Sequence, residues 1–126
     1  MGIALVIKDR LEEEHYNNIY KASNNKLRIK RPMIYKDITV WASFKFDGAS
    51  IPWPVMFLFT KNDIAKGDVA ACFHDWMCEH KHLYKRKYAT HILLKLWKMA
   101  GLPSWKAGII YACVEAYQMT QKGWKE

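Results

Sequence analysis

Short apolar and aromatic segments dominate the first half of the chain. Segments 3–7, 27–30 and 38–46 are rich in β-branched and aromatic residues, which predicts strands. Segment 38–46 has the clearest pattern, because apolar and polar residues alternate from Val40 onward. One face carries Ala42, Phe44 and Phe46. We expect one continuous strand there. Segment 11–20, acidic at its start, fits a helical turn or a solvent-facing arm.

Helical spacing replaces this pattern in the second half. Apolar residues recur at helical intervals over segments 68–79, 84–100 and 104–119. Thr60, Asn62 or Asp63 could cap a further helix, and Gly101 and Pro103 separate the last two. The last helix is apolar on most of its surface, so we expect it to lie centrally.

Strands followed by helices predict an α+β fold, with a small antiparallel sheet in the N-terminal half followed by three packed helices. The length of 126 residues fits a single domain spanning 1–126. We expect strands over about 1–52 and the helical part over about 60–120.

Composition narrows the class of protein further. The formal net charge is +8, but the basic residues are spread out, and the densest run covers residues 81–87. No apolar stretch approaches the ~20 residues of a membrane span. Residues 1–8 resemble a strand more than a signal peptide. The three cysteines lie in apolar helical patterns, which favours free thiols in a reducing compartment such as the cytoplasm.

Two stretches concentrate the candidate chemistry. Residues 46–53 read Phe-Asp-Gly-Ala-Ser-Ile-Pro-Trp, the end of a strand running into a turn, and residues 73–76 read Phe-His-Asp-Trp on a predicted helix. If turn and helix meet, they bring together four candidate catalytic residues: Asp47, Ser50, His74 and Asp75.

Each candidate also has a structural interpretation. Asp47 could be a general base or a metal ligand, or it could cap its own turn. Ser50 could be a nucleophile, but no G-x-S-x-G motif surrounds it, which favours a turn role. His74 could carry protons near neutral pH, or it could bond Asp47 and lock turn to helix. Asp75 needs a partner, because an unpaired buried charge is costly. We expect that partner to be a backbone N–H, Ser50 or a basic side chain.

A divalent metal ion is the candidate cofactor. Its ligands would be Asp47, His74 and Asp75. Alternatively, His74 and Cys78, four residues apart on one helical face, could begin a zinc site. Such a site needs two more ligands, from Asp47, His80, His82 or His91.

The turn 46–52 and the helix motif Ala70-Ala71-Cys72-Phe73-His74-Asp75-Trp76 together resemble the phage and prophage family called domain of unknown function 1353. The resemblance covers roughly residues 27–124, including Gly123-Trp124 near the end. It implies a tailed-phage or prophage gene, with the protein in the bacterial host cytoplasm or in the virion. One departure stands out: an Ala-Asp pair expected on the second helix is Ala89-Thr90 here, followed by His91.

Three functions follow as hypotheses. The first is a small hydrolase, possible substrates being peptidoglycan, a nucleotide or a phosphoester. The second is a non-enzymatic virion or host-interaction protein in which the same residues form a structural lock and Trp53 contacts a partner. The third is nucleic-acid binding through the basic run, with Lys85, Arg86 and Lys87 as contacts; it lacks a recognised motif.

Overall fold

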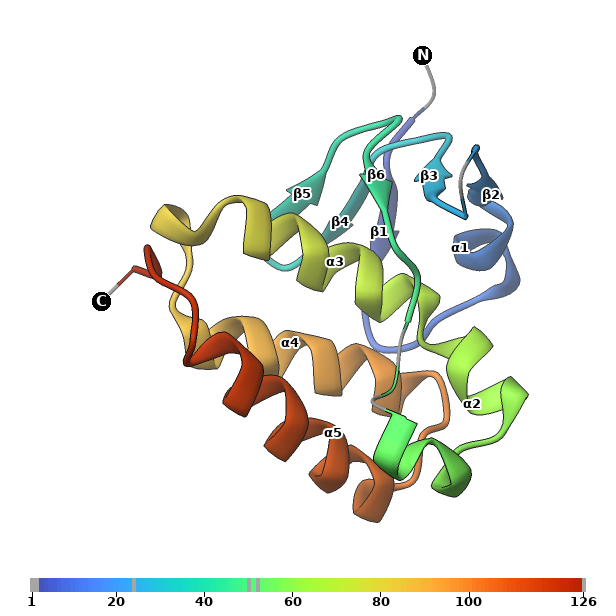
Figure 1. Cartoon of the computed structure of the whole chain (residues 1–126). Helices are drawn as coiled ribbons and strands as arrows, with labels where there is room; N and C mark the ends of the chain where they lie inside the picture. The colour runs from blue at the N-terminus through green and yellow to red at the C-terminus, as the bar shows by residue number, and fades with distance from the viewer. Residues whose placement is uncertain (1–2, 24, 50, 52, 126) are drawn as a thin grey trace.

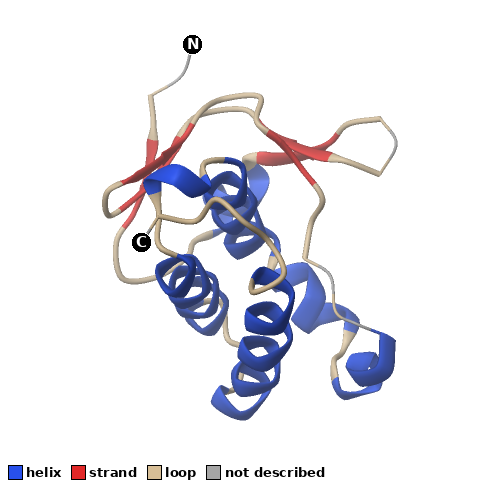
Figure 2. Ribbon diagram, turned by 60° about the vertical axis from the view of Figure 1, so that its left-hand side comes forward, coloured by secondary structure: helices blue, strands red, loops and turns tan. Residues whose placement is uncertain are grey.

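Strands gather along one side of the molecule and most helices along the other, with the short helix at Glu13–Asn17 on the strand side (Figures 1 and 2). This computed structural model describes residues 3–23, 25–49, 51 and 53–125. The arrangement confirms the α+β fold class. No helix within the described residues is both long and apolar enough to cross a membrane.

The strands form two three-stranded sheets rather than one. The first has the order β1 (Leu5–Ile7), β4 (Met33–Tyr35), β5 (Ile38–Val40), with β1 parallel to β4 and β4 antiparallel to β5. The second is antiparallel throughout, in the order β2 (Ile19–Lys21), β3 (Leu27–Ile29), β6 (Lys45–Phe46).

The prediction of one continuous strand over 38–46 was wrong. The chain leaves the first sheet after β5, turns at Ser43, and enters the second sheet as β6. Ser43 has a φ of 68°, and its N–H donates to the carbonyl of Ile29 at 2.8 Å. Alternation of apolar and polar side chains survives such a turn, so the pattern alone did not reveal it.

The helices agree closely with the sequence predictions. They are α1 (Glu13–Asn17), α2 (Lys61–Lys66), α3 (Asp68–Glu79), α4 (Arg86–Met99) and α5 (Ser104–Gln118), with short 3₁₀ helices η1 (Trp53–Leu58) and η2 (Lys81–Leu83). Thr60 caps α2, because its hydroxyl accepts from the Asp63 N–H at 3.0 Å while the Asp63 carboxylate accepts from the Thr60 N–H at 2.9 Å.

Helix α3 lies centrally, with β5 and β6 on one side and α4 on the other. Its buried residues Cys72, Phe73 and Met77 belong to the main hydrophobic core. The prediction that places 104–119 at the centre was wrong: α5 packs on α4 at the outside, with Tyr111 and Tyr117 exposed. Part of its apolar surface faces a cavity instead of the core.

The junction between α2 and α3 is held by close packing at Gly67. A Cβ atom at this position would lie 2.5 Å from the Trp97 ring and 2.9 Å from Ala49. Trp97 in turn donates its indole N–H to the Asp63 carbonyl at 2.9 Å. Trp97 and Ala49 both line the cavity described next, so this junction helps to shape it.

Candidate functional site

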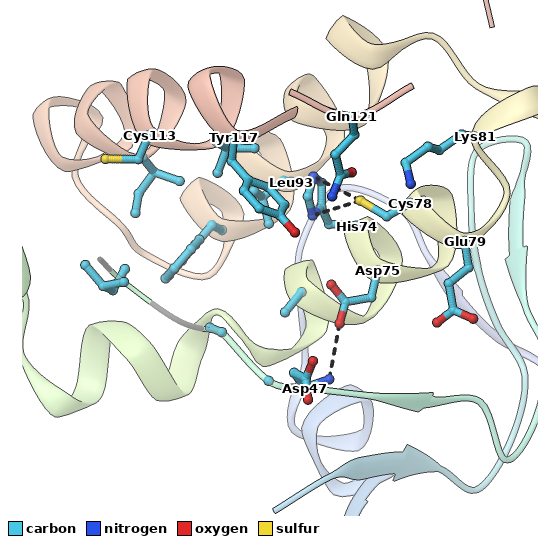
Figure 3. Close-up of a pocket in the computed structure, with 17 residues that line it drawn as sticks. Asp47, His74, Asp75, Cys78, Glu79, Lys81, Leu93, Cys113, Tyr117 and Gln121 are labelled. Carbon is cyan, nitrogen blue, oxygen red and sulfur yellow. Dashed lines mark hydrogen bonds between the residues drawn. The ribbon is translucent and has the colours of Figure 1, made fainter. Parts of the chain in front are cut away.

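A cavity of about 600 Å³ lies between the segment after β6 and the helices α3, α4 and α5 (Figure 3). The chain therefore brings the predicted turn and the predicted helix motif to one place. The polar and sulfur-bearing lining residues are Asp47, His74, Asp75, Cys78, Glu79, Lys81, Cys113, Tyr117 and Gln121. A volume of this size fits a small-molecule site, which typically spans several hundred Å³.

His74 is held by a glutamine that is distant in sequence. The Nε2 atom of His74 lies 2.5 Å from Oε1 of Gln118, at the end of α5. Gln118 is completely buried, and its Nε2 donates to the hydroxyl of the equally buried Thr90 at 2.6 Å. Thr90 donates in turn to the Arg86 carbonyl at 3.3 Å.

This network fixes which nitrogen of His74 carries the proton. The Gln118 amide nitrogen faces three acceptors: the Thr90 hydroxyl, the Arg86 carbonyl and the Glu115 carboxylate. The amide oxygen must therefore point at His74, and an oxygen can only accept. His74 then donates from Nε2, which leaves Nδ1 as the acceptor nitrogen, with the Cys78 thiol as its neighbour.

Burial also keeps this imidazole uncharged. Desolvation lowers the pKa of His74, and the hydrogen bond to Gln118 opposes that effect. The Sγ of Cys78 lies 3.7 Å from Nδ1. Burial raises the pKa of Cys78 to about 12, so this sulfur is a thiol at neutral pH and not a thiolate nucleophile.

Burial favours the neutral form of Asp75 as well, which for a carboxyl group means a raised pKa. Burial raises its pKa to about 6, even though its Oδ2 accepts from the Asp47 N–H at 3.2 Å (Figure 3). Of the three partners considered for Asp75, the structure shows the backbone N–H. Neighbouring Asp47 and Glu79 raise the pKa further, whereas Lys26 lowers it.

The Asp47 side chain does not join His74. Its carboxylate is exposed and pairs with Lys26, which directly precedes β3. The predicted lock between His74 and Asp47 was therefore wrong in its partners: the helix is tied to the turn through Asp75 and the Asp47 backbone. A second tie comes from Asp68, which accepts from the Ala49 N–H at 3.2 Å.

The other residues predicted to form the site are not shown in the cavity. Ser50 lies outside the described residues. Trp53 lies on η1, exposed over 82% of its surface, and does not line the cavity. Lys85 and Lys87 are exposed, whereas Arg86 forms an ion pair with Glu115 and so is already occupied.

The histidines considered as further zinc ligands lie elsewhere. His80 places Nδ1 2.7 Å from the Trp76 carbonyl and stacks on the Trp76 ring, while His82 and His91 are exposed. Within the part of the chain that the structure describes, no three His, Cys, Asp or Glu side chains gather closely enough to hold a metal ion.

Sequence reasoning missed Gln118, the residue that orients His74. Its signal is an apolar stripe, Ile110, Val114 and Gln118 at intervals of four, in which one member is polar. Thr90 was noticed only as a departure from the family pattern. The structure places it inside the network, where its hydroxyl contacts Gln118, while His91 points outward.

Fold and site together define a small α+β protein with a cavity between the segment that follows β6 and the helices α3, α4 and α5. The family model described as protein of unknown function (DUF1353) matches residues 24–114. The chain belongs to this family, as its two motifs indicated. Neither a curated protein nor a solved structure matched it.

Proposed function

We propose that this protein is a small hydrolase in which His74 and Asp75 act as base and acid. One observation carries the proposal: two adjacent residues line one cavity, and burial favours the neutral form of each. Burial keeps the imidazole unprotonated and raises the pKa of the Asp75 carboxyl to about 6. A neutral histidine and a protonated carboxylic acid are the base and acid that hydrolysis of an acyl bond requires.

The reaction follows from these protonation states. A water oxygen bonds to the substrate carbonyl carbon while Nδ1 of His74 takes one of its protons. The bond from that carbon to the leaving oxygen then breaks, and Asp75 gives its proton to this oxygen. Transfer of the proton from His74 to Asp75 through solvent restores both groups. One water and one ester give one acid and one alcohol.

The pH dependence of ester hydrolysis tests this assignment. The rate should fall as pH rises through about 6, because Asp75 loses its proton, and fall again in acid, because His74 becomes protonated. The measurement is kcat/KM for ethyl acetate by pH-stat. A rate that rises continuously above pH 7 would contradict the acid role of Asp75.

Two variants separate the two roles. His74→Ala should lower kcat/KM by roughly a hundredfold or more on ethyl and p-nitrophenyl acetate alike. Asp75→Asn should affect the ethyl ester far more, since p-nitrophenolate leaves without being protonated. His82→Ala removes an exposed histidine outside the cavity lining and serves as the control. Equal rates in His74→Ala and His82→Ala would reject the hydrolase.

A second candidate is a non-enzymatic protein of a phage particle or a host complex. It is favoured by η1, where Trp53 and Phe57 are exposed over 82% and 81% of their surfaces. Exposed aromatic side chains of this kind are common at protein contacts. Quantitative mass spectrometry of purified particles tests it: fixed stoichiometry in the particle would support this role, and exclusion from the particle would reject it.

A further inference from the structure

The cavity runs along α3 and α5 from an apolar end to a polar end. His74 meets Gln118, and seven residues further on the Lys125 N–H donates to the Lys81 carbonyl at 2.9 Å. The two segments therefore run in the same direction. Ala71, one turn before His74, and Ile110, two turns before Gln118, lie towards one end of the cavity.

The apolar end is closed and the polar end is open. Trp97 and Ile110 are each only 2% exposed, and Leu93 and Ile51 are also buried. Asp47 and Glu79, in contrast, are exposed, and Lys81 is half-buried. A ligand that fills this cavity therefore enters past the charged groups and places an apolar portion deepest.

Next to this closed end, the half-buried side chains of Cys113 and Val114 line the space that a ligand can reach. Protein interiors pack as densely as organic crystals, and empty apolar space lowers stability. The close approach of Gly67 to Trp97 shows that packing around the Trp97 ring is tight, so this ring forms the closed floor of the cavity. An aliphatic group on a ligand would cover the accessible apolar surface of Cys113 and Val114.

We infer that the hydrolase acts on acyl compounds with an aliphatic chain. The chain would lie against the half-buried Cys113 and Val114, above the buried Trp97, with the carbonyl beside His74 and Asp75. This inference rests on the proposed function, because it assigns a substrate class to the same cavity. The polar end holds both acidic and basic side chains and so favours neither charge on a substrate. Selection among substrates therefore comes from the apolar end.

Chain-length preference tests the inference directly. Each buried methylene contributes ~0.8 kcal/mol, so p-nitrophenyl hexanoate should exceed p-nitrophenyl acetate in kcat/KM by roughly a hundredfold. Ala71→Leu should reduce this ratio to below roughly tenfold, because the new side chain occupies the space of the acyl chain. Equal kcat/KM values for the two esters in the wild type would overturn the inference.

Matched variants control for general effects. Ala112→Leu adds the same side chain on the exposed face of α5 and should keep the wild-type ratio. If Ala71→Leu fails to fold, Val114→Phe fills the cavity from a half-buried position. A ratio that falls equally in Ala112→Leu and the cavity variant would count against the acyl site.

A binding measurement separates this inference from the proposed function. Hexanamide and acetamide carry the two acyl groups without an ester, and the Trp97 indole resonance reports on the apolar end. A shift with hexanamide that is absent with acetamide and in Ala71→Leu supports the acyl site even if neither ester is hydrolysed. No shift with hexanamide overturns the acyl site even if hydrolysis is observed.

Discussion

His74 and Asp75 are neighbours in sequence but lie in contrasting surroundings. On the side of His74, buried Gln118 and Thr90 form a chain of side-chain hydrogen bonds that spans α3, α4 and α5. On the side of Asp75, a single backbone N–H from Asp47 is the hydrogen bond that the described residues supply, and the nearby charges are of both signs: Asp47 and Glu79 raise the pKa, and Lys26 lowers it.

The hydrogen bonds around His74 stabilise the fold, whereas the buried carboxyl of Asp75 lowers its stability when ionised. Hydrogen bonds between well-placed buried groups stabilise the fold. A buried carboxyl whose pKa rises to about 6 destabilises the fold once it ionises. A residue that destabilises its own fold is more easily explained by chemistry than by structure.

Removing the hydrogen bonds of Gln118 should lower the free energy of unfolding more than any other substitution considered. Gln118→Leu removes the acceptor of the His74 Nε2–H and the donor to the Thr90 hydroxyl and the Arg86 carbonyl. Each buried polar group that loses its partner costs ~1–3 kcal/mol of stability. We expect a loss of about 3 kcal/mol in the free energy of unfolding, measured by urea denaturation. The 15N shifts of His74 should also lose the signature of a single Nε2–H tautomer.

Tyr117→Phe is the control for this variant. Tyr117 is the neighbouring residue on α5, its side chain is exposed, and phenylalanine keeps the ring. Its unfolding free energy and its His74 tautomer should match those of the wild type. A Gln118→Leu protein in which the tautomer of His74 is unchanged would show that the network does not fix the proton.

Asp75→Asn should increase the free energy of unfolding at neutral pH, in contrast to Gln118→Leu. The folded-state pKa is raised from 3.8 to about 6, so the stability present below pH 4 is lost as pH rises through 6. That loss amounts to about 3 kcal/mol at neutral pH. Asparagine can still accept from the Asp47 N–H without ionising. The variant should unfold at higher urea concentration at pH 7.5 and lose the pH dependence between 4 and 6.

The wild type measured across the same pH range is the reference for Asp75→Asn. If Asp75 were chiefly a structural tie between turn and helix, the variant would be less stable than the wild type at pH 7.5. That outcome would remove the electrostatic argument for Asp75 as an acid and leave the contact with Asp47 as its role.

The helices were predictable because their signals are local. Segment 68–79 matches α3, since apolar spacing and the turn before it lie within a few residues of each other. The strands were less predictable, because the turn at Ser43 that divides β5 from β6 depends on the two sheets and not on the alternation of side chains.

Half of the candidate site was predictable for the same reason. His74 and Asp75 stand in one short motif, and the need of Asp75 for a partner follows from the cost of burying a charge. The contact of His74 with Gln118 joins residues 44 positions apart on two helices. Sequence spacing could not reveal which face of α5 would meet α3, and so it suggested Asp47 as the partner instead.

The smallest effects are expected at the exposed pair Lys26 and Asp47. Such ion pairs contribute about 0.5 kcal/mol or less, so Lys26→Ala and Asp47→Ala should barely change the free energy of unfolding. Their effects on the pKa of Asp75 should nevertheless be opposite. Removing Lys26 takes away a positive charge and raises that pKa, whereas removing Asp47 takes away a negative charge and lowers it.

An NMR titration of the Asp75 carboxyl measures both shifts. Asp47→Ala keeps the backbone N–H that donates to Asp75, so any change reports the side-chain charge alone. Shifts of opposite sign with unchanged stability would show that the turn tunes the acidity of Asp75 without holding the fold. Loss of several kcal/mol in Asp47→Ala would instead make its side chain a structural part of the turn.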